Sequence, residues 1–136
     1  MLIYMILLML LFHVIDDFGL QHITHLNDMK QKLWWINQCA IAKAQGIDTY
    51  KYRHDYIVCL FLHAFKWSCM IMLPMFFFYG LTLHPLFIVG LLISNIGIHA
   101  SVDNLKANHY SLNLIQDQLI HIAQILITAL CTYFIF

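Results

Sequence analysis

The chain opens with MLIYMILLMLLF (residues 1–12), which has no charged side chain, and continues directly into HVIDDFGLQ (residues 13–21), which has two adjacent aspartates. At the end of a soluble helix, water solvates such side chains at no cost. Inside a bilayer they are expensive, because one carboxylate near the centre costs about 3 kcal/mol even on mild insertion scales. The composition of the remaining chain distinguishes these two cases.

The composition is that of an integral membrane protein. Of the 136 residues, 62% are hydrophobic and only 10% are charged, whereas soluble domains carry about 25% charged residues. The mean hydropathy is +0.74. Seven basic and seven acidic side chains give a formal net charge of zero, which argues against a nucleic-acid partner because phosphate binding needs clustered basic residues. The four cysteines lack the spacing of a metal or disulfide framework.

Four windows are apolar over about 20 residues, the length that crosses a bilayer core of about 30 Å. We expect transmembrane helices at about residues 1–20, 56–80, 85–105 and 112–136. Pro85 suits the first position of the third helix. The first window lacks the basic region and cleavage site of a signal peptide, so we expect it to persist as a helix. The sequence therefore predicts an all-α fold: one transmembrane domain, residues 1–136, folded as a four-helix bundle.

Residues 22–55 differ from these windows because they hold five of the seven basic residues, Lys30, Lys32, Lys43, Lys51 and Arg53. Apolar residues recur there at helical spacing: Leu26, Met29, Leu33, Ile36 and Ala40. Gly46 follows as a stop signal. We interpret the segment as an interfacial amphipathic helix between the first two transmembrane helices. A short soluble helix packed on the bundle is the alternative.

The distribution of basic residues also predicts the topology. The 22–55 loop is basic, whereas the turn at residues 81–84 has no Lys or Arg. Basic loops stay in the cytoplasm, so we expect a multi-pass protein of the bacterial inner (cytoplasmic) membrane with both termini outside. Membrane lipids are then its first partners, and a second membrane protein or a second copy of the chain is a further candidate.

Histidine and aspartate recur at matching depths in the four predicted helices. His-x-x-x-Asp occurs in the first and third helices, Asp-x-x-x-His in the fourth, and one histidine in the second: His13, Asp17, His63, His99, Asp103, Asp117 and His121. A spacing of four places each pair on one helix face. With a rise of about 1.5 Å per residue, the histidines lie roughly 9–12 Å and the aspartates roughly 3–6 Å below the cytoplasmic boundary. We therefore expect these seven side chains to converge.

Three carboxylates at close quarters need a cation or protonated histidines among them. Imidazole and carboxylate together suit zinc, manganese or iron better than magnesium or calcium. We expect the seven side chains to be ligands of a divalent metal, zinc first, with manganese or iron as alternatives. Seven ligands exceed one tetrahedral site, so they imply two metals or one metal with supporting side chains. Four neighbours are candidates for orienting the ligands: Gln21, Asn95, Gln118 and Lys106.

Other charged residues lie near this set. Lys106, and Lys30 or Lys32, are candidate charge partners for the aspartates at the mouth of the site. Asp16 lies about 100° from Asp17 on a helix, and we expect it to meet lipid headgroups or lysine side chains. Lys66 lies near mid-membrane, where it either faces the same polar interior or snorkels to the surface.

These residues, in this order, resemble a family of small bacterial and phage membrane proteins known as domain of unknown function 3307. The resemblance spans nearly the whole chain and rests on His13-x-x-x-Asp17-Phe18-x-x-Gln21, Lys30 or Lys32, His63, His99-x-x-x-Asp103-x-x-Lys106 and Asp117-Gln118-x-x-His121. The resemblance implies a four-helix membrane protein. Its motif residues include the histidines and aspartates that lie at matching depths in the four predicted helices. It implies no activity.

The site logic favours a membrane-embedded metal-dependent hydrolase that acts at the cytoplasmic headgroup layer on a lipid or lipid-linked phosphate. A metal activates a bound water, and an aspartate that is not a ligand acts as general base; Asp17, Asp103 and Asp117 are the candidates. The alternative is a non-catalytic phage or bacterial membrane interaction protein with a structural metal or a bare His/Asp cluster. Proton or metal-ion transport is disfavoured, because the outer halves of the helices have almost no polar residue.

Overall fold

The computed structural model describes residues 1–20, 25–80 and 84–136. Within these ranges the chain is 85% helical, with six α-helices and no strand. Four of the helical segments are long and apolar enough to cross a membrane. The predicted all-α class and the four long apolar helices are therefore confirmed.

The four long helices agree with the predicted windows to within about two residues. They are α1 (Leu2–Val14), which continues as a π-helical turn at Ile15–Leu20, α5 (Asp55–Tyr79), α6 (Pro85–Ala107) and α7 (Leu114–Ile135). Pro85 occupies the first turn of α6, as predicted. At the start of α7, the side chain of Asn113 accepts from the backbone of Gln116, and the Gln116 side chain accepts from the backbone of Asn113. This reciprocal cap makes α7 begin two residues later than expected.

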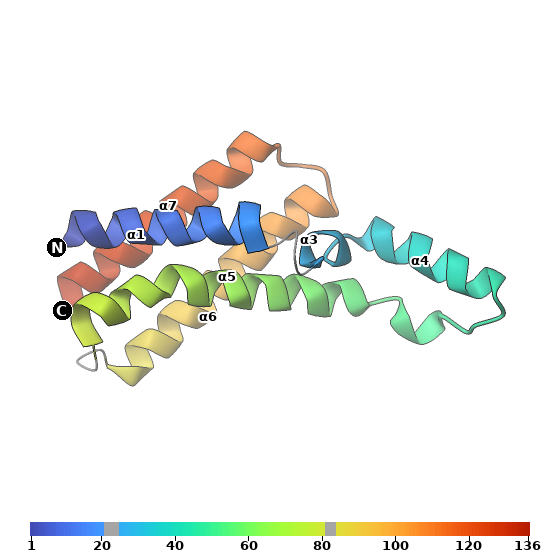
Figure 1. The fold of residues 1–136 in the computed structure, drawn as a ribbon, viewed down its shortest axis with the longest axis horizontal. Helices are drawn as coiled ribbons and strands as arrows, with labels where there is room; N and C mark the ends of the chain where they lie inside the picture. Colours follow the sequence, from blue (N-terminus) through green and yellow to red (C-terminus); the bar gives the residue numbers. More distant parts are fainter. Residues whose placement is uncertain (21–24, 81–83) are drawn as a thin grey trace.

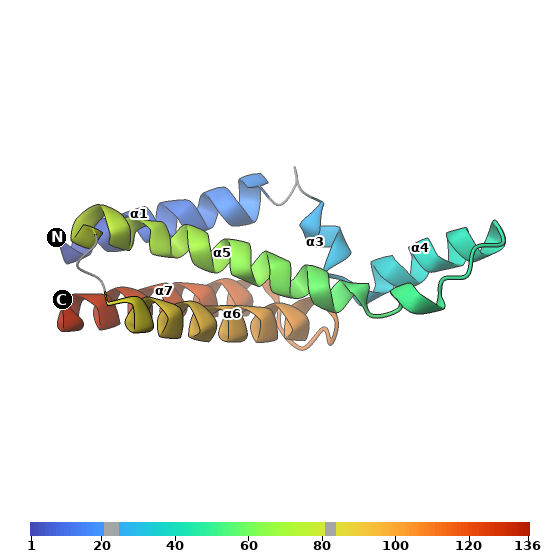
Figure 2. The ribbon, with the colours of Figure 1, turned by 90° about the horizontal axis from the view of Figure 1, so that it is seen from below.

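The four long helices lie side by side (Figures 1 and 2). Helix α1 packs against α5 and α7, and α6 packs against the same two helices. Both termini lie at one end, and the segment between α1 and α5 lies at the other (Figure 1). Near the termini the interior is mainly apolar, with a core of Met5, Met9, Trp67, Ile71, Met72, Met75, Ile125 and Ala129, although the polar side chains of Asn95, Gln124, Thr128 and Thr132 are buried there as well. Beyond Trp67, toward the opposite end, the interior becomes polar.

The last turns of the first long helix are not α-helical, because Ile15–Leu20 form a π-helix. A π-helix has more residues per turn, so two successive side chains point in more similar directions. Asp16 is fully buried and forms an ion pair with Lys66 on α5, with Oδ1 3.1 Å from Nζ. Lipid headgroups are thus the wrong partner for Asp16, and the alternative expectation of a lysine partner is confirmed.

The described part of the segment between α1 and α5, residues 25–54, is not the one continuous amphipathic helix that we expected; it forms two α-helices. These are α3 (Leu26–Met29) and α4 (Lys32–Ala44), followed by a 3-10 turn at Tyr50–Tyr52. The indole N–H of Trp35 donates to the carbonyl of Met29 across the break. Helix α3 packs against α5, whereas α4 extends away from the four long helices, beyond the start of α5 (Figure 2). Helix α4 ends two residues before Gly46, the predicted stop signal.

Candidate metal centre

Four histidines, one from each long helix, lie together in the polar half of the interior, and three of them contact Trp67. The ring of His99 stacks on Trp67 with 4.1 Å between centroids, and on His121 with 4.2 Å. The ring centroid of His63 lies 5.0 Å from that of His99, and the centroid of His13 lies 6.0 Å from that of His121. All four histidines are at most 3% exposed. The predicted convergence of the histidines is confirmed.

The first group with metal-ligand geometry consists of His63, His99 and Asp103. The Nε2 atoms of the two histidines lie 3.1 Å apart. Oδ2 of Asp103 lies 3.1 Å from Nε2 of His63 and 3.8 Å from Nε2 of His99. Metal–nitrogen bonds of about 2.0–2.1 Å at tetrahedral angles place two ligand atoms about 3.3 Å apart. The three atoms therefore have the spacing of ligands around one ion.

The second group consists of Asp103, Asp117 and His121. Nε2 of His121 lies 3.5 Å from Oδ1 of Asp103 and 3.4 Å from Oδ1 of Asp117. Asp103 belongs to both groups and presents a different oxygen to each. A carboxylate in this position can bridge the two ions of a two-metal centre, which lie about 3.5–4 Å apart. The arrangement thus offers five ligands for one ion or for a bridged pair.

Each carboxylate of the two groups also has a lysine partner. Nζ of Lys30 lies 2.5 Å from Oδ2 of Asp103, and Nζ of Lys106 lies 2.5 Å from Oδ2 of Asp117. Lys30, at the end of α3, is buried, whereas the Lys106 side chain is 33% exposed. These pairs confirm the expectation that lysines neutralise the aspartates. The Lys30 ammonium group lies on the same Asp103 oxygen that faces His63, whereas Lys106 lies on the Asp117 oxygen that does not face His121.

Asn108 at the end of α6 holds the backbone that carries Lys30. Its amide nitrogen donates to the carbonyl of Lys30 at 3.3 Å and to the side-chain oxygen of Asn104 at 2.9 Å. Its own side-chain oxygen accepts from the backbone N–H of Lys32 at 2.7 Å. Asn108 therefore fixes both sides of the break between α3 and α4. The sequence gives no signal of this role, because no local spacing relates Asn108 to residues more than 70 positions away.

The structure places His13 and Asp17 outside both groups. The indole N–H of Trp67 donates to Nδ1 of His13 at 2.8 Å, so Nε2 carries the ring proton and donates to Oε1 of Gln118 at 3.1 Å. The amide nitrogen of Gln118 donates to Oδ2 of Asp17 and to Oδ2 of Asp117, both at 3.2 Å. Gln118 therefore links this pair to the second group. Metal ligation by His13 and Asp17 stays a prediction.

The remaining predicted neighbours lie elsewhere. Oδ1 of Asn95 accepts from the Gln124 amide at 2.8 Å and from the Thr128 hydroxyl at 3.1 Å. These contacts join α6 to α7 in a separate polar layer, one turn nearer the termini than His99. The structure therefore shows the Asn95 side chain hydrogen-bonded to α7 and not to one of the predicted metal ligands. Gln21 lies outside the described residues.

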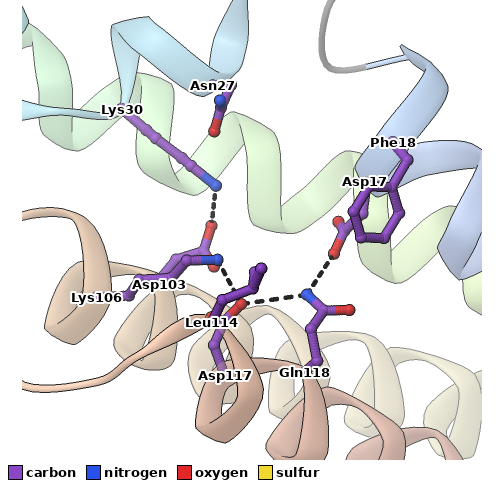
Figure 3. Close-up of a pocket in the computed structure, with 9 residues that line it drawn as sticks. All are labelled: Asp17, Phe18, Asn27, Lys30, Asp103, Lys106, Leu114, Asp117 and Gln118. Atoms are coloured by element: carbon purple, nitrogen blue, oxygen red, sulfur yellow. Dashed lines mark hydrogen bonds and ion pairs between the residues drawn. The ribbon is translucent and has the colours of Figure 1, made fainter.

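A cavity of about 180 Å³ lies over the two groups, at the end of the long helices nearest α3. Its lining residues are Asp17, Phe18, Asn27, Lys30, Asp103, Lys106, Leu114, Asp117 and Gln118 (Figure 3). The cavity reaches the molecular surface, since a third of the Lys106 side chain is exposed. The three aspartates therefore line the way out of the cluster, as predicted. The cavity is strongly polar, with three carboxylates, two ammonium groups and the amides of Asn27 and Gln118.

Sequence reasoning missed Trp67, which touches three of the four histidines. A signal for it was present, because Trp67 follows His63 by four residues and therefore lies on the same face of α5. It belongs to the same spacing pattern that selected the other pairs.

Comparison with protein-family models, with curated proteins and with solved structures finds no match to this chain. The resemblance to the domain of unknown function 3307 family therefore stays a prediction.

Proposed function

We propose that this protein is a four-helix integral membrane protein that binds one or two divalent metal ions and hydrolyses a lipid or lipid-linked phosphate. Zinc is the first candidate, and manganese and iron are the alternatives. The proposal rests on one observation: two His/Asp groups that share Asp103 lie beneath a cavity lined by Asp17, Lys30 and Lys106. A buried ligand set with an adjoining polar cavity is what a metal-dependent hydrolase requires.

The position of the cavity supports a substrate in the headgroup layer. Helices of 22 to 25 residues, such as α7 and α5, span a bilayer core of about 30 Å, so the cavity at their ends lies near the membrane surface. Helix α4 carries exposed Leu33, Ile36 and Ile41 together with Lys32 and Lys43, which suits an interfacial helix. The basic residues favour the cytoplasmic side of the bacterial inner membrane, with both termini outside.

The hydrolysis needs two groups: a metal that activates a water molecule, and Asp17, which takes the proton of that water. A bound metal lowers the pKa of its water toward neutrality and polarises a phosphoryl oxygen. Asp17 lines the cavity, lies outside both ligand groups and is oriented by the Gln118 amide. It is therefore the general base: it takes the water proton as the water oxygen bonds to phosphorus and the bond to the leaving group breaks.

The experiment is release of the leaving group from lipid phosphates by purified protein in vesicles, with zinc, manganese or iron added. We expect His63→Ala to abolish turnover and metal binding together. Asp17→Asn should keep the metal and lower turnover by about 10²–10⁴-fold. His109→Ala, at an exposed position, is the matched control and should change neither. A fully metallated protein that releases nothing from phosphomonoesters or diphosphates of lipids would contradict the hydrolase proposal.

One observation favours a second function, that of a non-catalytic membrane interaction protein. Three buried carboxylates have a lysine partner, in the pairs Asp16–Lys66, Asp103–Lys30 and Asp117–Lys106. Such pairs make buried carboxylates tolerable in a membrane without any metal. On this view the polar cluster fixes the helix packing, and α4 is the partner surface. Purified protein that folds fully and holds no metal would favour this function.

A further inference from the structure

We infer that Lys30 and Lys106 are exchangeable counter-ions: a metal displaces them from Asp103 and Asp117, and the released ammonium groups then bind a phosphoryl anion in the cavity. The inference rests on the proposed function and deepens it, because it names the group that the cavity recognises. It also makes metal binding and anion binding mutually dependent.

The first step follows from shared oxygen atoms. Oδ2 of Asp103 has Nζ of Lys30 at 2.5 Å and Nε2 of His63 at 3.1 Å. A metal held by His63, His99 and Asp103 would lie about 2 Å from the same oxygen, so Lys30 and the metal would be like charges in near contact. Like charges at such distances repel strongly in a site this buried. The lysine and the metal therefore compete for the carboxylate.

The second carboxylate also has a lysine and a histidine beside it, but on different oxygens, since Nε2 of His121 lies 3.4 Å from Oδ1 of Asp117. Nζ of Lys106 lies 2.5 Å from Oδ2 of Asp117, and the Gln118 amide donates to the same oxygen at 3.2 Å. A metal at the second group would withdraw the negative charge that holds Lys106. The Gln118 amide nitrogen also donates to Asp17. It therefore stays hydrogen-bonded to a carboxylate when Lys106 leaves Asp117.

The ammonium groups of both lysines can move into the cavity after release, because both side chains line it. Figure 3 shows the two ammonium groups beside Asp103 and Asp117 within it. Lysine is a point charge on a flexible four-carbon stem, so its head group can turn without movement of the backbone. Lys30 keeps its backbone anchor at Asn108 during this change. The displaced ammonium groups thus remain next to the metal.

The cavity has three carboxylates beside its two ammonium groups and two amides. A divalent metal held by Asp103 and Asp117 would offset the charge of these two carboxylates, and the ammonium groups, the amides and the metal would together match a phosphoryl group. Such a group carries up to two negative charges and three acceptor oxygens, which these donors can neutralise and hydrogen-bond together. The volume of about 180 Å³ accommodates the phosphoryl head group and leaves any attached chain outside. A lipid headgroup and a free phosphate monoester share this chemistry.

The exchange has a thermodynamic consequence that can be measured. Metal binding frees the lysines for the anion, so the anion must in turn strengthen metal binding by the same factor, typically about 5–150-fold. Replacing both lysines removes the competition and both charged donors of the anion site at once. The double variant Lys30→Met/Lys106→Met should therefore bind metal more tightly than the wild type, yet should respond to the anion much less, because only the amides and the metal remain to bind it.

The experiment is calorimetric titration of zinc into the full-length protein, with and without phenylphosphonate, a soluble phosphoryl anion that is not hydrolysed. We expect phenylphosphonate to raise the zinc affinity of the wild type about tenfold. The double variant should bind zinc at least about tenfold more tightly than the wild type without phenylphosphonate, and phenylphosphonate should raise its zinc affinity much less. Lys43→Met, an exposed lysine on α4, is the control and should behave as the wild type.

A second arm identifies the source of the anion. The protein is placed in nanodiscs of phosphatidylcholine alone or with phosphatidic acid. A rise in zinc affinity with phosphatidic acid but not with phenylphosphonate assigns the site to a lipid headgroup. A rise with both shows that the phosphoryl group alone suffices. A rise with neither overturns the inference.

Removal of the buried Lys30 and the partly exposed Lys106 leaves two buried carboxylates without a lysine partner and lowers the stability of the double variant in the absence of metal. Thermal unfolding is therefore a second readout, because zinc should raise the unfolding midpoint of the double variant more than that of the wild type. An equal or smaller rise contradicts the exchange. Zinc binding that does not depend on the lysines overturns only this inference, whereas the absence of zinc binding in both proteins contradicts the proposed function as well.

Discussion

The indole N–H of Trp67 donates to Nδ1 of His13 at 2.8 Å, while the ring of Trp67 stacks on His99 at 4.1 Å. One buried side chain of α5 therefore orients a histidine of α1 and a histidine of α6. Because Nδ1 of His13 is an acceptor, its Nε2 donates to the Gln118 oxygen. This turns the Gln118 amide nitrogen toward Asp117.

Trp67→Phe tests this chain of contacts. Phenylalanine keeps an aromatic ring against His99 but has no donor for His13, whose Nδ1 is then buried without its partner. We expect the free energy of unfolding in detergent to fall by about 1–3 kcal/mol. Trp34→Phe, on α4, is the matched control and should change stability much less. Equal losses in the two variants would show that the donor is unimportant.

The two aspartates joined by Gln118 should respond differently to removal of charge. Asp117 belongs to a ligand group, so Asp117→Asn should release metal and lower the thermal stability together. Asp17 lies outside both groups, so Asp17→Asn should retain the metal. Elemental analysis beside thermal unfolding measures both effects. If Asp17→Asn loses as much metal as Asp117→Asn, Asp17 is a ligand rather than the base.

The sequence predicts well how deep each histidine of the site lies along its helix. The rise per residue is nearly constant, so the four histidines had to lie at a common level once four antiparallel helices were assumed. Spacing of four likewise placed His99 with Asp103, and Asp117 with His121, on one helix face. The structure brings these residues together for that reason.

Sequence reasoning names lysines as partners of the aspartates but misses the backbone features that bring them together, because these features depend on local backbone geometry or on distant segments. The π-helical turn at Ile15–Leu20 changes the direction of Asp16, and a calculation based on regular α-helical spacing cannot anticipate it. The break between α3 and α4 depends on Asn108, which lies far away in sequence. Both features move a charged side chain inward: the first buries Asp16, and the second brings Lys30 to Asp103.

The Asp16–Lys66 pair should stabilise the contact between α1 and α5 without taking part in metal binding. Removing one partner of a buried ion pair costs about 3–5 kcal/mol. The Lys66 side chain is 25% exposed, so we expect the lower end of this range for Asp16→Asn or Lys66→Met. The double variant should recover part of the loss. Unfolding of all four proteins in detergent measures the coupling, and simple additivity of the two single losses would contradict the pair.

Asn95→Leu should separate the second polar layer from the metal centre. Asn95 accepts from Gln124 and Thr128 on α7, and hydrogen bonds between membrane helices average about 0.6 kcal/mol, with a maximum near 1.7. We expect a loss of stability within that range and unchanged metal content. A loss of metal would show instead that Asn95 orients His99.

The most direct test of the metal centre is elemental analysis of the protein purified from cells, without added metal, beside His63→Ala and His109→Ala. His63 supplies a ligand atom to the first group, whereas His109 is exposed. We predict one or two equivalents of zinc, manganese or iron per chain in the wild type and in His109→Ala, and a clear loss in His63→Ala. A folded wild-type protein without metal, or equal metal content in all three proteins, would contradict the assignment of this cluster as a metal centre.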